Sequence, residues 1–136
     1  MSDKKRRWLP TVGELIDRLS IHQLKEVFIP ENKDNYANEI DDMVHDIDLI
    51  LKEHKGEITG EIIRAIVVLS QMNAHIWYNE SEARKGINAG ENLRLTHGLN
   101  GIRNTAKNKI QERCGGRKDY KVDCLGAEFE DWEVSW

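Results

Sequence analysis

The chain has 136 residues, which is enough for one domain whose core needs no disulfide or metal. Charged residues make up 32% and apolar residues 39%, and only two prolines occur, a composition typical of a soluble, helix-rich protein. The net charge of −4 argues against general binding to nucleic acid or acidic membranes, and no apolar run reaches the ~18 residues that cross a bilayer. We therefore expect one domain over residues 1–136, in the cytoplasm, with Cys114 and Cys124 as free thiols.

A basic arm over residues 1–9 precedes the first predicted helix. Thr11 and Glu14 form a T-x-x-E capping box, and Pro30 ends the helix near Phe28. Apolar residues recur at helical spacing on two sides of this helix. Such a helix lies in the centre of a bundle or in a subunit interface, so we expect a homo-oligomer. One side consists of Val12, Leu15, Ile16, Leu19 and Val27, and the other of Ile21, Leu24 and Phe28.

Periodicity and capping signals predict three further helices, over about 34–54, 59–85 and 93–113. The last two are joined by a glycine-rich loop at 86–90. The predicted fold class is all-α, a four-helix bundle over residues 10–113. Residues 114–136 form an extended, acidic C-terminal tail that carries Phe129, Trp132 and Trp136. Aromatic residues at this density predict that the tail packs onto its own domain, with docking on another subunit as the alternative.

One row of side chains on the third helix changes from apolar to polar along the helix, while all of its residues stay on the same face. It begins with Ile62, Ile66 and Leu69 and continues with the four residues of what we call the polar stripe, Asn73, Trp77, Glu80 and Arg84. A polar group that is buried without a partner costs on the order of 1–3 kcal/mol. The polar stripe therefore either meets partners across the core or lines a cavity.

The fourth helix carries a matching set of polar residues. Because the connecting loop is short, the third and fourth helices should be antiparallel neighbours. Three cations of the two helices, Arg84, Arg103 and Lys107, outnumber the single acid Glu80. This excess of positive charge favours an anionic ligand such as a phosphate or a carboxylate, with Trp77 stacked on a base or a sugar. Two other interpretations are a buried polar network and a surface for a partner protein. The predicted ligand-binding residues are Asn73, Trp77, Glu80, Arg84, His97, Asn100, Arg103, Asn104 and Lys107.

Acidic residues form a second candidate cluster on the first two helices. Glu14 and Asp17 are three residues apart, and so are Glu39 and Asp42. Carboxylates on two facing helices can hold Mg²⁺, so these four residues are an alternative metal site. The competing interpretations are an exposed acidic face on the second helix and, for Asp17, pairing with Arg18, His22 or a cation on another helix.

Two resemblances bear on these motifs. The segments Pro10-Thr-Val-Gly-Glu-Leu-Ile-Asp-Arg-Leu-Ser-Ile21, Asn73-x-x-x-Trp77-x-x-Glu80 and His97-Gly-Leu-Asn-Gly-Ile-Arg-Asn104 resemble small uncharacterised helical proteins from tailed-phage and bacterial genomes. That resemblance implies a helical fold and a phage-type origin. The acidic spacing of Glu14 to Asp17 and of Glu39 to Asp42 is similar to that of the MazG-like nucleoside triphosphate pyrophosphohydrolases, four-helix units whose paired acidic motifs hold Mg²⁺.

The sequence contains no nucleophile elbow, Walker-type loop or G-x-G-x-x-G motif, so no catalytic machinery is evident. We expect a small phage-type protein that binds an anionic, nucleotide-like ligand between the third and fourth helices without a cofactor, and that sequesters a host signal. It would act in the host cytoplasm if a phage encodes it. The alternatives are a Mg²⁺-dependent nucleoside triphosphate pyrophosphohydrolase and a protein inhibitor that binds a host enzyme.

Overall fold

A computed structural model describes residues 4–54, 58–115 and 134–136. The fold is an all-α bundle of four helices, as predicted, and no strand occurs in the described ranges. None of the described helices carries an apolar stretch that could cross a bilayer. Most of the predicted tail, including Phe129 and Trp132, lies outside the described residues, as does Cys124. The helices are α1 (Val12–Phe28), α2 (Lys33–His54), α3 (Gly60–Arg84) and α4 (Ala89–Cys114), with a 3-10 turn, η1 (Pro30–Asn32), after α1.

The helix ends are set by local signals. The Thr11 hydroxyl accepts a hydrogen bond from the backbone N–H of Glu14 at 3.2 Å, so the predicted capping box begins α1. Thr59 caps α3 in the same way, accepting from the N–H of Ile62 at 3.3 Å. Pro30 opens η1, which turns the chain from α1 into α2.

The start of α4 was predicted too late. The expected loop at 86–90 is shorter, because α4 begins at Ala89. The chain reverses over Gly86 and Asn88, whose φ angles of 78° and 43° are in the left-handed region. The carbonyl of Asn88 then accepts from the N–H of Asn92 at 2.9 Å, which closes the first turn of α4.

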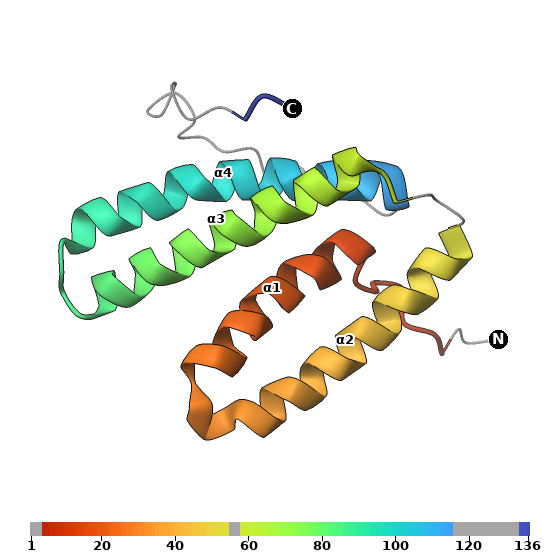
Figure 1. The fold of residues 1–136 in the computed structure, drawn as a ribbon, viewed down its shortest axis with the longest axis horizontal. Helices are drawn as coiled ribbons and strands as arrows, with labels where there is room; N and C mark the ends of the chain where they lie inside the picture. Colours follow the sequence, from red (N-terminus) through yellow and green to blue (C-terminus); the bar gives the residue numbers. More distant parts are fainter. Residues whose placement is uncertain (1–3, 55–57, 116–133) are drawn as a thin grey trace.

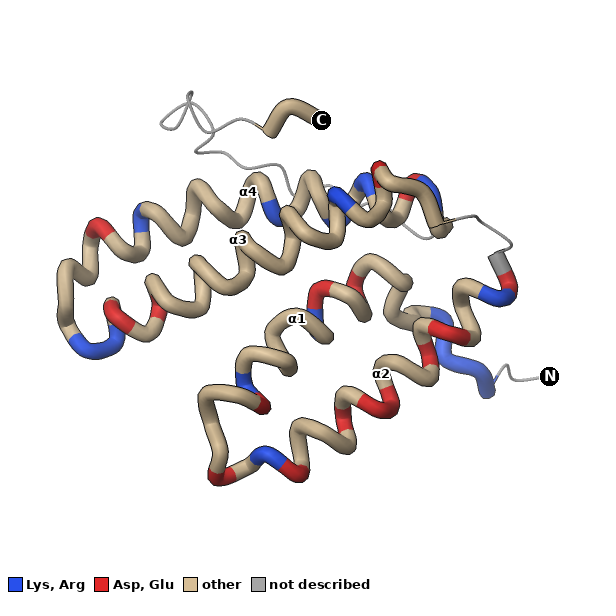
Figure 2. The backbone as a smooth tube through the Cα atoms, in the orientation of Figure 1, with Lys and Arg blue, Asp and Glu red and all other residues tan. Residues whose placement is uncertain are grey.

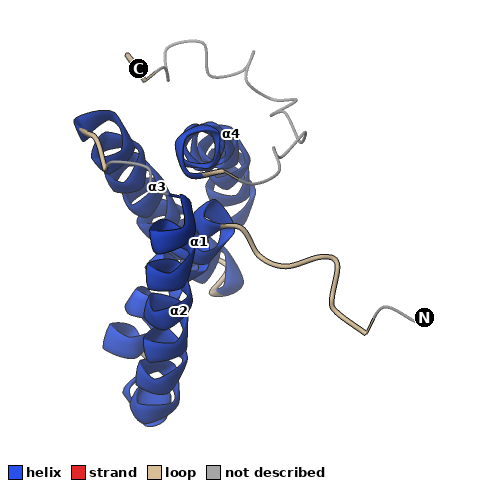
Figure 3. Ribbon diagram, turned by 90° about the vertical axis from the view of Figure 1, so that its right-hand side faces the viewer, coloured by secondary structure: helices blue, strands red, loops and turns tan. Residues whose placement is uncertain are grey.

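The four helices form two hairpins, α1–α2 and α3–α4, with α1 in the centre (Figure 1). In the turned view α1 lies between α2 and the α3–α4 pair (Figure 3). Helix α1 contacts all three other helices, whereas α2 packs mainly on α1. The prediction that a helix with two apolar sides is central is therefore confirmed. The buried core gathers where α1 and α3 begin and α4 ends, and consists of Val12, Ile62, Ala65, Leu69, Ala106, Ile110 and Cys114.

Helix α3 has 25 residues and is longer than α1, which has 17 and packs against it. Val12, at the start of α1, shares the core with Ile62, and Phe28, at the end of α1, lies against Trp77 with the ring centroids 5.4 Å apart. The two helices therefore run in the same direction, and α1 ends at the level of Trp77. From there α3 continues to Arg84 for about 10 Å, at 1.5 Å per residue. Beyond α1 the α3–α4 hairpin projects as a two-helix layer (Figure 1).

Candidate functional site

The polar stripe starts as a buried network with α1. Asn73 is fully buried, and its Nδ2 donates to Asp17 Oδ1 at 2.7 Å and to Ser20 Oγ at 2.6 Å. Ser20 in turn donates to the backbone carbonyl of Asp17 at 2.8 Å. The prediction that Asp17 pairs with Arg18, His22 or another cation was wrong, because its described partner is a neutral amide. The start of the polar stripe thus meets partners across the core.

The rest of the polar stripe passes the end of α1. The indole of Trp77 lies against Phe28, with an angle of 32° between the ring planes. Glu80 and Arg84 pair with each other at 3.8 Å, and their side chains are 41% and 79% exposed. The stripe becomes polar because α3 extends beyond α1, so water can solvate its last two turns. A hollow of about 320 Å³ lies at the tip of the hairpin, lined by Glu80, Ala83, Arg84 and Leu93.

The predicted residues on α4 include an incompletely paired cation, Arg103. Arg103 is partly buried, and its Nη2 donates a long hydrogen bond of 3.3 Å to Asn104 Oδ1. Among the described residues no carboxylate pairs with Arg103. Three buried atoms have no hydrogen-bond partner in the described part of the chain: Arg103 Nε, Thr96 Oγ1 and Asn73 Oδ1. A buried polar atom without a partner is unusual and marks a place where a further polar group could bind.

The remaining predicted residues differ in their exposure. Lys107 and Asn104 are buried, Asn100 is partly buried and His97 is exposed. Of the nine predicted ligand-binding residues, only Glu80 and Arg84 line the hollow at the hairpin tip. The set is therefore divided into a buried network with α1, an exposed pair at the tip and a polar face of α4.

Three of the four carboxylates of the alternative metal site have separate partners, and the fourth, Asp42, is exposed. Asp17 is bound to Asn73, and Glu14 accepts from the Thr11 hydroxyl at 3.3 Å. Glu39 Oε2 lies 2.5 Å from His22 Nε2, a pair that joins α2 to α1 and that the sequence alone did not predict. In the part of the chain that the structure describes, no group of three or more His, Cys, Asp or Glu residues could hold a metal ion. Acidic residues instead recur along the length of α2 (Figure 2), and they are exposed, Asp42 and Asp46 included.

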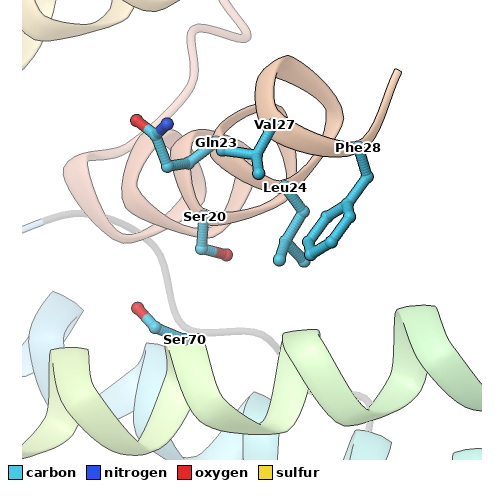
Figure 4. Close-up of a pocket in the computed structure, with 6 residues that line it drawn as sticks. All are labelled: Ser20, Gln23, Leu24, Val27, Phe28 and Ser70. Atoms are coloured by element: carbon cyan, nitrogen blue, oxygen red, sulfur yellow. The ribbon is translucent and has the colours of Figure 1, made fainter. Parts of the chain in front are cut away.

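A second hollow, which the sequence analysis missed, lies between α1 and α3 (Figure 4). Its volume is about 290 Å³, and we call it the α1–α3 groove. Its apolar wall consists of Leu24 and Phe28, from the second apolar side of α1, and Val27, from the first. The extension of both apolar sides to the end of α1 was the available signal. Ser20 of α1 and Ser70 of α3 lie on opposite sides of it (Figure 4), and each hydroxyl donates to a backbone carbonyl of its own helix. The lining residues are Ser20, Gln23, Leu24, Val27, Phe28 and Ser70.

The last residues of the chain pack onto their own domain. The Trp136 ring lies under two cations, with Arg64 Cζ 5.6 Å and Lys109 Nζ 5.0 Å from its centroid. Arg64 Nη2 also donates to Ser135 Oγ at 2.9 Å. For Trp136 the prediction of docking on its own domain is therefore confirmed. Cys114, at the end of α4, is buried as a free thiol, and this burial raises its pKa above the usual 9.0.

Comparison of the chain with protein-family models, with curated proteins and with solved structures found no match. The resemblances to phage-type helical proteins and to the MazG-like family therefore stay predictions.

Proposed function

We propose that the chain is a small binding protein that holds an anionic, nucleotide-like ligand against the α3–α4 hairpin, with Arg103 as the main contact. The observation that carries the proposal is that the guanidinium of Arg103 has no described carboxylate partner, and that its Nε is buried without a hydrogen bond. A partly buried cation is stabilised by a paired anion, and a guanidinium binds phosphate or carboxylate through parallel hydrogen bonds.

The register of the hairpin supports this assignment. Arg113 Nη2 on α4 lies 2.6 Å from Glu61 Oε2 on α3, and the helices are antiparallel neighbours. Moving along both helices from this pair places Arg103 at about the level of Asn73. A ligand that displaced the side chains covering Asn73 and Thr96 would gain an acceptor in Asn73 Oδ1 and a donor in the Thr96 hydroxyl, which lack partners in the described part of the chain.

Neighbouring side chains extend the same surface. Asn100 and Lys107 lie three and four residues from Arg103, so they share its face of α4. Trp77 of α3, whose ring lies against Phe28 at the end of α1, offers an indole for stacking a base or a sugar. Such a surface binds a ligand without a catalytic group, which fits sequestration of a signal molecule. If the chain has the phage origin that its resemblance implies, that molecule is a host nucleotide in the host cytoplasm.

Isothermal titration calorimetry with a panel of mononucleotides, dinucleotides and cyclic nucleotides tests the proposal. At least one should bind, and Arg103→Ala should weaken binding by roughly tenfold or more, because a charge-assisted pair contributes about 1.5–3 kcal/mol. Arg18→Ala is the matched control, since Arg18 is an exposed arginine on α1. The proposal fails if no nucleotide binds the wild-type chain, or if Arg103→Ala and Arg18→Ala bind equally well while both retain the helical circular dichroism spectrum.

A further inference from the structure

An apolar ridge borders the α1–α3 groove. Val27 and Phe28, the last two residues of α1, line the groove and are nevertheless 62% and 60% exposed. The groove itself is large compared with the ~30 Å³ that one water molecule occupies in the liquid. A protrusion and a hollow of the same apolar character therefore lie side by side at the end of α1 (Figure 4).

The apolar surface continues along α3. Ile63, Val67 and Tyr78 are 53%, 47% and 61% exposed. They share one side of α3 with Ser70, because residues spaced by three, four, seven or eight positions lie on the same face. We call these three residues, together with Val27, Phe28 and the groove, the apolar face.

We propose that the apolar face is the contact surface between two copies of this chain, related by a twofold axis. A twofold contact uses the same patch on both partners, so the patch must fit itself. The ridge beside the groove meets that requirement, since the ridge of each copy can enter the groove of the other.

The charge of the apolar face favours a second copy over a charged partner. All six residues that line the groove are uncharged, although the chain carries a net charge of −4. No charge within the groove therefore opposes contact with a second copy. An acidic or basic partner would gain nothing from this face, because electrostatic complementarity needs charges of the opposite sign.

The exposed apolar residues supply about half of the area that a dimer needs. With ~200 Å² for a whole aromatic side chain and ~100 Å² for an aliphatic one, the five exposed residues leave about 400 Å² of apolar surface open. That is roughly half of the ~800 Å² that each partner buries in a standard interface, and the rest would come from the groove and its polar rim. This proposal is independent of ligand binding by Arg103.

Sedimentation equilibrium of the full chain over a range of concentrations tests the proposal. The expected mass at high concentration is twice the 15.8 kDa of the chain. Val27→Lys should weaken the dimer roughly tenfold or more, because it places a charge in an apolar contact. The monomer should fold normally with this substitution, because Val27 is exposed in the last turn of α1, where a positive charge interacts favourably with the helix dipole. Leu49→Lys is the control, because Leu49 is 49% exposed on α2, away from the apolar face.

Two results would overturn the proposal. One is a wild-type chain that stays monomeric at every concentration, which would leave the groove to another segment of the chain or to a different protein. The other is a dimer that Val27→Lys leaves intact, or that Leu49→Lys weakens to the same extent. Val27→Ala removes the ridge without adding charge, so it should weaken the dimer in the same direction and would do so even if the lysine variant failed to fold.

Discussion

Replacement of Asn73 by alanine should be among the more damaging polar substitutions in this protein. The fully buried amide donates to Asp17 and to Ser20, and alanine would remove both hydrogen bonds. The bond to the carboxylate contributes about 1.5–3 kcal/mol and the bond to the hydroxyl about 0.5–1.5 kcal/mol. The carboxylate of Asp17 is only partly buried, so water can recover some of this loss. We expect Asn73→Ala to lower the free energy of unfolding by about 2–4 kcal/mol.

Urea denaturation followed by circular dichroism measures this loss, with the m-value unchanged if the variant still unfolds in two states. A loss of ~3 kcal/mol should lower the melting temperature of a domain of this size by about 10 °C. Asn38→Ala is the matched control on the exposed side of α2 and should stay within about 0.5 kcal/mol of the wild type.

A double-mutant cycle with Asp17→Ala isolates the contact itself. The interaction energy of the pair should be about 1.5–3 kcal/mol, because the double variant no longer leaves a carboxylate without its donor. If Asn73→Ala costs as little as the Asn38→Ala control, or if the effects of Asn73→Ala and Asp17→Ala are simply additive, then Asn73 does not anchor the polar stripe to α1.

Two further predictions concern packing and pH. A Cβ on Gly13 would lie 2.7 Å from Gln111 Cγ, so Gly13→Ala should destabilise the fold by about 1–2 kcal/mol despite the better helix propensity of alanine. Gly60→Ala meets no atom within 4 Å and should be neutral or slightly stabilising, and equal melting temperatures for the two variants would contradict this difference. Burial raises the pKa of Cys114 above 9.0, so above pH 9 the folded state retains a proton that the unfolded state loses, and stability should fall as the pH rises. In denaturant titrations the free energy of unfolding of Cys114→Ala should fall less than that of the wild type between pH 8 and pH 10. An equal fall in both proteins would contradict a raised pKa for Cys114.

The helices themselves could be predicted from the sequence because their signals are local. A capping hydroxyl bonds a backbone N–H three residues away, and Pro30 acts on its immediate neighbours, so Thr11, Thr59 and Pro30 set the ends of α1 and α3 without reference to the rest of the fold. The start of α4 was missed because Asn88 adopts a left-handed conformation, which a few non-glycine residues tolerate and which composition alone does not reveal.

The candidate site was only partly predictable, since it depends on where separate helices end relative to one another. Periodicity placed Asn73, Trp77, Glu80 and Arg84 on one face of α3, and that face is real. Only the tertiary structure decided that α1 covers its first half and ends beside Trp77, so Asn73 is buried against Asp17 while Arg84 is exposed to solvent. The spacing of residues fixes the directions in which side chains leave a helix, whereas their burial is fixed by contacts between residues that are distant in the chain.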